Sequence, residues 1–364
     1  MKILNKNYLF IVLVLALLIG CTEQSEGPFR PGSGSNDPSD SENWLIPQSE
    51  VLDGGPGKDG IPALNEPKVV GSTEIDYLED EDLVLGYAEN GEAVAYPHKI
   101  LDWHEIINHE VASTSLAVIY CPLTGTGIGW NRSISAGKTT FGVSGLLYNT
   151  NVIPYDRLTD TNWSQMRFEA VNGQLIGEKP EVISLIETSW ATWKQMYPET
   201  QVVSGETGHN RNYGNYPYGD YKTNHNSLLF PVNKTDIRLQ AKKRVLGIMK
   251  GQNAKVYPIE RFDEETQLVF DTFQGEPIAV IGNKKANIVV ALNRRLSDGT
   301  VLDLTLAGGA SNPWLLEDQE GNQWNLFGKA IAGPREGESM EEIPQMMGFW
   351  FSWPPFFEGI EIYE

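Results

Sequence analysis

Short apolar stretches alternate with turn residues along most of the chain, which is the pattern of β-strands joined by tight turns. Asn-Gly or Asp-Gly pairs end the turn segments 89–91, 171–173 and 297–299. Helical periodicity is scarce, and its best candidate is 184–196, where Ile186, Trp190 and Trp193 share one helical face. The pattern predicts a mainly β protein (β-rich α+β) with few short helices.

The strand pattern repeats along the chain. Residues 84–97 match 245–258, and further matching islands follow in the same order at offsets of 160 to 162 residues, ending with paired tryptophans at 190/193 and 350/353. Similar hairpin composition would explain the first islands but not the tryptophans. We therefore predict two related β halves, 44–204 and 241–364, packed about a pseudo-two-fold axis and joined by a tyrosine-rich connection, 205–240.

One predicted hairpin carries most of the candidate chemistry. Its strands are 104–111 and 116–121, both rich in β-branched and aromatic residues. Pairing Val111 with Leu116 would set Ile106 opposite Cys121. His104 would then lie on the same face as Cys121, one diagonal away, where Cβ atoms are roughly 7–8 Å apart or less.

The N-terminus has the form of a bacterial lipoprotein signal, residues 1–20. Lys2 and Lys6 precede an apolar stretch, and Leu18-Ile19-Gly20-Cys21 resembles a lipobox that would make a lipidated Cys21 the mature N-terminus. An ordinary secretory signal or a short membrane anchor is the alternative. Residues 21–43 are polar and predict a disordered tether. We expect an extracytoplasmic protein of the cell envelope, anchored by lipid at the outer membrane or cell surface.

Charge and cysteine count narrow the function further. The formal net charge of −20 argues against nucleic acid as a partner. The chain has two cysteines, so with Cys21 lipidated Cys121 has no intramolecular partner. In an oxidising compartment such a thiol is buried and inert, a metal ligand or a reactive group.

Three chemistries remain open for Cys121. With His104 and His98 it could hold a transition metal, namely copper, zinc or iron. Alternatively, His104 could activate the thiol, so that Cys121, His104 and the adjacent Glu105 are the catalytic candidates. The third possibility is a structural role for both residues.

Two further comparisons bear on this choice. The repeat places Cys121 opposite Asn283 and His98 opposite Ile259, so the shared fold does not require either residue. The histidines at 104 and 109 are five residues apart, which excludes the zinc-protease helix motif with its four-residue spacing.

The segments 141–151 and 205–221 could line a cleft. Asn149 and Asn151 are either turn residues or part of that cleft, and Ser144 lacks the strand–turn–helix setting of a hydrolase nucleophile. Several polar residues of the connection could close over the cleft, or could belong to a solvated loop: His209, Arg211, Tyr218, Asp220 and His225.

Four long motifs, AYPHKILDWHEIINHEV, AVIYCPLTGTG, FGVSGLLYNTNVIPYDR and NWSQ, resemble the bacterial family catalogued as domain of unknown function 3179. The resemblance implies an envelope or secreted domain, often lipid-anchored, with no established reaction. Its shared motif positions give the binding candidates Ser144, Asn149, Asn151, Asp156 and Arg157. The family commonly has a second cysteine where this chain has Thr124, so a Cys-Pro-x-Cys dithiol is not expected here.

We therefore expect a lipid-anchored envelope protein with a Cys121/His104 site for a transition metal or thiol chemistry. The alternative is a binding or scaffold lipoprotein without catalysis. It would contact glycan or protein partners through aromatic surfaces near 213–221 and 349–357.

Overall fold

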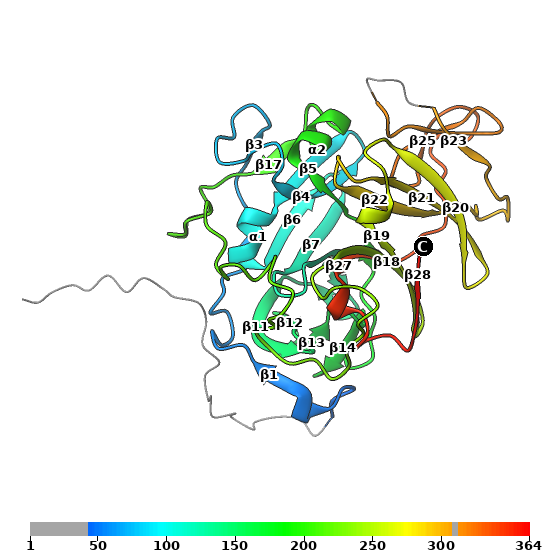
Figure 1. Ribbon diagram of the computed structural model, residues 1–364. Coiled ribbons are helices and arrows are strands. Elements are labelled where there is room, and N and C mark those ends of the chain that lie inside the picture. Colours follow the sequence, from blue (N-terminus) through cyan, green and yellow to red (C-terminus); the bar gives the residue numbers. More distant parts are fainter. Residues whose placement is uncertain (1–42, 308–311) are drawn as a thin grey trace, which may run out of the picture.

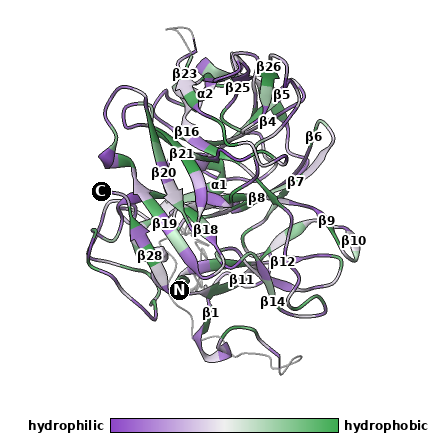
Figure 2. Ribbon diagram, turned by 90° about the vertical axis from the view of Figure 1, so that its right-hand side faces the viewer, coloured by the Kyte–Doolittle hydropathy of each residue, from purple (hydrophilic) through white to green (hydrophobic). Residues whose placement is uncertain are grey.

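A computed structural model of the chain describes residues 43–307 and 312–364. Strands dominate these residues and confirm the mainly β prediction, and apolar and polar stretches alternate along several of the strands (Figure 2). Within the described ranges no helix is long and apolar enough to cross a membrane. The helical segments are α1 (His98–His104), α2 (Trp190–Met196), and the 3-10 turns η1 (Gln48–Glu50), η2 (Ile259–Arg261) and η3 (Trp350–Ser352).

Residues before the connection form three five-stranded sheets and one small ribbon. The first sheet has the order β15 (Val182–Ile183), β8 (Thr126–Asn131), β7 (Thr114–Cys121), β6 (Ile106–Val111) and β2 (Leu64–Asn65). The second is β1 (Val51–Asp53), β11 (Phe141–Tyr148), β12 (Asn151–Asp156), β13 (Asn162–Ser164) and β14 (Glu169–Asn172). The third is β16 (Ile186–Ser189), β4 (Leu83–Glu89), β5 (Glu92–Pro97), β17 (Gln201–Val203) and β3 (Val69–Gly71). The ribbon pairs β9 (Ser133–Ile134) with β10 (Gly137–Lys138).

Three sheets follow the connection. One has the order β27 (Gln345–Phe349), β18 (Arg244–Lys250), β19 (Asn253–Pro258) and β28 (Gly359–Ile362). Another is β20 (Gln267–Phe273), β21 (Glu276–Asn283) and β22 (Ile288–Asn293). The last is β23 (Leu304–Leu306), β24 (Leu316–Asp318), β25 (Gln323–Trp324) and β26 (Ala330–Ala332).

Corresponding sheets in the two halves share their strand order. The β4–β5 hairpin lies between antiparallel β16 and parallel β17, and the β18–β19 hairpin lies between antiparallel β27 and parallel β28. In both hairpins the last pair is valine with proline, Val84 with Pro97 and Val245 with Pro258. These are correspondences that the repeat predicts; the two-fold axis itself stays a prediction.

The hydrophobic cores are shared between the halves. Strand β27 lies against β8, and β16 lies against β22 (Figure 1). One core cluster combines Cys121 and Trp130 with Val245 and Trp353, and another combines Trp193 of the first half with Ile281 and other residues of the second. Each half therefore buries apolar surface that the other half supplies.

The paired tryptophans found in the repeat have matching positions. The ring of Trp193 packs directly on Gly86, and that of Trp353 on Gly247, so a Cβ atom at either glycine would overlap the ring. Both rings are fully buried. Because buried tryptophans cover 150–250 Å² each, this glycine–tryptophan contact contributes strongly to both cores.

The hairpin formed by β6 and β7 exists, but its predicted register was wrong. Val111 pairs with Thr114, not Leu116, and Ile106 pairs with Ile119. A two-residue turn replaces the expected four-residue loop because Ala112 adopts a positive φ of 50°. The predicted strand start was also wrong: His104 is the last residue of α1, and Cys121 pairs with Thr126 of β8.

The predicted helix 184–196 is only partly correct. Its first residues form strand β16, whose pairing with β4 outweighs their helical spacing, and α2 starts at Trp190. The Ser189 hydroxyl caps the helix by accepting the Thr192 N–H at 3.2 Å.

The connection, 205–240, contains no described helix or strand, yet Tyr213, Tyr221 and Phe230 are buried. The aromatic residues of the run 349–357 are also largely buried, and a surface there for glycan or protein partners stays a prediction. Trp44 forms a β-bridge with Asn172 at the start of the described chain. The signal peptide 1–20, Cys21 and most of the tether 21–43 lie outside the described residues, and the domain boundaries stay predictions.

Candidate functional site

Glu105 directly follows the last residue of helix α1 and has an unusual backbone conformation. Its φ of 57° and ψ of −37° lie outside the common regions for a residue with a side chain. Two hydrogen bonds hold it there: the Glu105 N–H donates to Leu101 O and the Glu105 carbonyl accepts from Tyr120 N–H, both at 2.8 Å. Such strain concentrates at functional sites.

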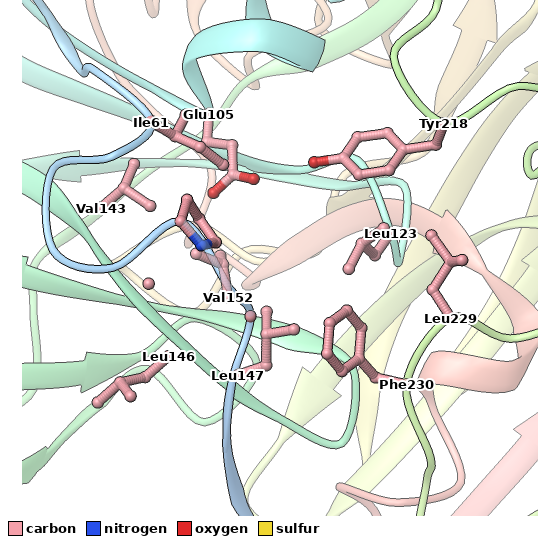
Figure 3. A pocket seen from close by; sticks show the side chains of 13 residues that line it. Ile61, Glu105, Leu123, Val143, Leu146, Leu147, Val152, Tyr218, Leu229 and Phe230 are labelled. Atoms are coloured by element: carbon pink, nitrogen blue, oxygen red, sulfur yellow. The ribbon is translucent and has the colours of Figure 1, made fainter. Parts of the chain in front are cut away.

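The Glu105 side chain lines a mainly apolar pocket (Figure 3). The non-atom space in the pocket is about 530 Å³ with open solvent included, but the cavity that a water molecule can occupy is only about 40 Å³. Its walls include Leu123, Leu147 and Phe230, and the carboxyl group of Glu105 and the hydroxyl group of Tyr218 point toward one another across it. A concave, apolar site with few polar groups is the usual form of a small-molecule site.

Five separate segments build this pocket, one of them the β7–β8 turn with Leu123. The loop 54–61 forms one wall and is fastened to β11 by hydrogen bonds from Gly54 N–H to Gly145 O (2.7 Å) and from Asp59 N–H to Val143 O (2.8 Å). Gly145 has a φ of 80° and lies so close to Gly57 that a Cβ atom would overlap it. The hairpin β11–β12, the α1 end and the connection supply the other walls.

Burial determines the charge of Glu105. The residue is 7% exposed. Removal from water, helped by the nearby negative charge of Asp102, raises the pKa of Glu105 to about 8. At neutral pH the side chain is therefore mainly a neutral acid, which can donate one hydrogen bond and accept another.

Cys121 is buried in the core beside this pocket, with 1% of its surface exposed. Its thiol donates to Thr150 O at 3.7 Å. Burial, followed by the charge of Glu105, raises the pKa of Cys121 to about 11. The thiol is therefore protonated at neutral pH, which is the inert state for nucleophilic attack.

His104 is buried and both of its ring nitrogens are engaged. Nδ1 lies 2.7 Å from Pro62 O, and Nε2 lies 2.7 Å from the Tyr213 hydroxyl. Because a carbonyl only accepts, Nδ1 carries the proton and Nε2 accepts from Tyr213. Burial lowers the pKa of His104 to about 4, so the ring is neutral.

His98, the third candidate ligand, faces a different set of residues. Its Nε2 lies 3.3 Å from Glu187 Oε2, and its ring packs on Tyr120 with centroids 4.6 Å apart. Burial, aided by the charges of Lys222 and Arg244, holds the pKa of His98 well below its usual value. Among the described residues no three His, Cys, Asp or Glu side chains are grouped to hold a metal ion. The expected ligand set of Cys121, His104 and His98 is therefore not assembled.

The predicted binding residues of β11 and β12 bond within the protein. Ser144 Oγ donates to Ile153 O, and Asn149 Oδ1 accepts from Asn233 N–H at 2.8 Å. Asn151 Nδ2 donates to Gln165 Oε1 at 2.7 Å.

Asp156 and Arg157 are also engaged. Asp156 accepts from Trp163 Nε1 at 3.1 Å, and Arg157 pairs with Asp59 at 2.5 Å. The last contact helps to hold the pocket loop. A direct binding role for these side chains and for those of Ser144, Asn149 and Asn151 stays a prediction.

Comparison with known proteins supports the resemblance seen in the sequence. The family model described as a protein of unknown function, DUF3179, matches residues 58–359. The chain belongs to the DUF3179 family. The matched region includes Glu105, Cys121 and Tyr218. Of the residues that line the pocket, only Gly54 and Pro56 precede it. No curated protein and no solved structure gave a significant match.

Of the DUF3179 residues that form the pocket, the sequence singled out Glu105 and Tyr218 but did not place them together. It missed the apolar walls, Leu147 and Phe230 among them. The glycine-rich stretch 54–60 was the available signal, since clustered glycines often mark close backbone contacts.

Proposed function

We propose that this DUF3179 protein is a lipid-anchored cell-envelope protein that binds a small, mostly apolar molecule in the Glu105 pocket. The observation that supports it most is a neutral carboxylic acid, held by a strained backbone, that faces the Tyr218 hydroxyl inside apolar walls. A buried group of this kind has a high desolvation cost unless a ligand or water bonds to it.

The polar groups define the ligand's chemistry. The protonated Glu105 carboxyl group offers a hydrogen-bond donor and an acceptor. A hydroxyl or carbonyl group on a short apolar body would bond to it and bury its carbon atoms against Leu147 and Phe230. A permanently charged ligand would lose its hydration without gaining an ion pair.

The proposal belongs to the binding class of function. Copper, zinc or iron at Cys121 and His104 is not part of it, because both His104 nitrogens are bonded within the protein and the described residues do not group three possible ligands. The bonded His104 ring and the raised pKa of Cys121 argue against a Cys121 nucleophile. The aromatic surfaces considered for glycan or protein partners are not needed either, since their residues are largely buried.

Titration calorimetry with 1-hexanol and hexane-1-sulfonate tests the pocket. We expect hexanol to bind saturably and the sulfonate to bind at least tenfold more weakly. The substitution Leu147→Trp, which fills the pocket, should abolish hexanol binding, whereas Leu158→Trp at an exposed position should not. Glu105→Leu should weaken binding by up to about tenfold, the usual value of one hydrogen bond. Hexanol binding that survives Leu147→Trp in a folded protein would refute the assignment.

The lipid anchor has its own test. Without the Cys21 thiol no acyl chain can be attached, so Cys21→Ala should move the protein from the membrane fraction to the soluble fraction of cells that process lipoproteins. Cys121→Ala is the matched control and should leave the distribution unchanged. Retention of the Cys21→Ala protein in membranes would contradict the anchor.

A further inference from the structure

A second cavity lies between the two halves, and it shares no lining residue with the Glu105 pocket. It encloses about 1150 Å³ of empty space, part of it open to solvent. The β13–β14 turn and the segment before β15 form one side, and the β18–β19 turn with the C-terminal aromatic residues forms the other. We call this space the inter-half groove.

The groove combines an apolar floor with positive charge. Phe168, Phe356 and Phe357 contribute aromatic surface. Arg167, Lys179 and Lys250 also line it, against the single carboxylate of Glu169. The whole chain has a net charge of −20, whereas the residues that line this groove include three cations and one acid. The lining is therefore positively charged on a negatively charged protein.

Arg167 has more hydrogen-bond donors than its contacts with the described residues use. One of its terminal nitrogens pairs with Glu169 at 3.1 Å. Its Nε–H is buried and has no hydrogen-bond partner among the described residues. The side chain as a whole is 31% exposed and lines the groove, so an acceptor there can reach its terminal N–H groups.

The neighbouring residues support a binding role. Phe168 has a φ of 51°, which is strained for a bulky side chain, and it lines the groove. Lys250 is paired with Glu276 at 2.6 Å, so its charge, like that of Arg167, is partly compensated.

We propose that the inter-half groove binds an organic anion with an apolar, preferably aromatic, body. The anionic group accepts hydrogen bonds from Arg167 and is attracted by Lys179. The body packs on Phe168 and Phe357. This site is separate from the Glu105 pocket. The groove binds an anion, whereas the pocket favours a neutral molecule.

Naphthalene-2-sulfonate is a suitable probe, with naphthalene-2-methanol as the neutral analogue and inorganic sulfate as the anion without a body. Calorimetry on the protein purified without its signal peptide should show saturable binding of the sulfonate and at least tenfold weaker binding of the other two. Arg167→Gln should weaken the sulfonate by about tenfold or more, because a charged hydrogen bond is worth about 1.5–3 kcal/mol.

Two control variants distinguish binding at this site from non-specific binding and from binding in the Glu105 pocket. Glu169→Gln removes the competing carboxylate and should leave binding equal or tighter. Leu147→Trp should have no effect. Equal affinity for the neutral analogue, or sulfonate binding that Arg167→Gln leaves unchanged, would overturn the proposal; loss of sulfonate binding in Leu147→Trp would also do so.

Discussion

Replacing Arg244 with methionine should lower the free energy of unfolding by about 3–5 kcal/mol, the usual cost of leaving a buried charge without its partner. Arg244, at the start of β18, forms an ion pair with Glu187 of β16. The Glu187 side chain is only 2% exposed. The pair joins the two halves at a point where their cores meet.

No other cation would replace Arg244. His98 is the nearest candidate, with Nε2 at 3.3 Å from Glu187, but the low pKa of His98 keeps its ring neutral. The variant therefore retains a carboxylate that is removed from water and faces a neutral ring. Urea denaturation at pH 7 measures the loss directly.

The double variant Arg244→Met/Glu187→Leu should recover most of this loss, because two apolar groups of similar shape replace both charges. Lys68→Met is the matched control: Lys68 pairs with Glu206 at the surface, where such pairs contribute about 0–1 kcal/mol. Two results would contradict a buried ion pair between the halves. One is a decrease below 1 kcal/mol in the free energy of unfolding of Arg244→Met, and the other is a double variant less stable than both Arg244→Met and Glu187→Leu.

The sequence was sufficient for the β-rich fold because strand composition and turn residues are local signals. Asn90 and Gly91, for example, both adopt positive φ in the β4–β5 turn, as the Asn-Gly pair predicted. The prediction of the β6–β7 register was wrong because it also depended on a local signal, which is missing in this turn. Alanine at position 112 gives no sign of a positive φ, so the two-residue turn could not be recognised.

The candidate site was predictable only in part. Glu105 and Cys121 were named from the motif, and burial then determined their protonation, which no local pattern reveals. His104 was assigned to a strand because helix α1, which it ends, is only seven residues long, and so short a helix depends on tertiary contacts. The pocket needs residues from five separate segments, so its shape is a property of the packing.

The repeat helps to explain why the pocket belongs to the first half. Cys121 and Asn283 end the corresponding strands β7 and β21, and His98 and Ile259 begin the corresponding turns after a proline. The second half continues from Ile259 with a single 3-10 turn, whereas the first half forms α1 and reaches Glu105. The extra helical turn directs this carboxyl group inward.

Glu105→Gln should change the pH dependence of stability. The folded protein retains the Glu105 proton up to a pKa of about 8, whereas the unfolded chain loses it near 4.5. The folded state therefore binds more protons between these values, so raising the pH through this window destabilises it. The stabilisation is complete below pH 4.5 and is lost as the pH rises through 8.

Relative to Glu105→Gln, the native protein should lose roughly 3 kcal/mol between pH 5 and pH 8, since each pH unit in the window is worth up to about 1.4 kcal/mol. The comparison cancels the titration of Asp102 and other groups common to both proteins. Urea denaturation at pH 5, 6.5 and 8 measures the difference. Glu336→Gln, at an exposed position, is the control and should follow the native protein at every pH. Parallel pH profiles for the native protein and Glu105→Gln would mean that the Glu105 carboxyl group is solvated, and the neutral acid on which the pocket depends would not exist.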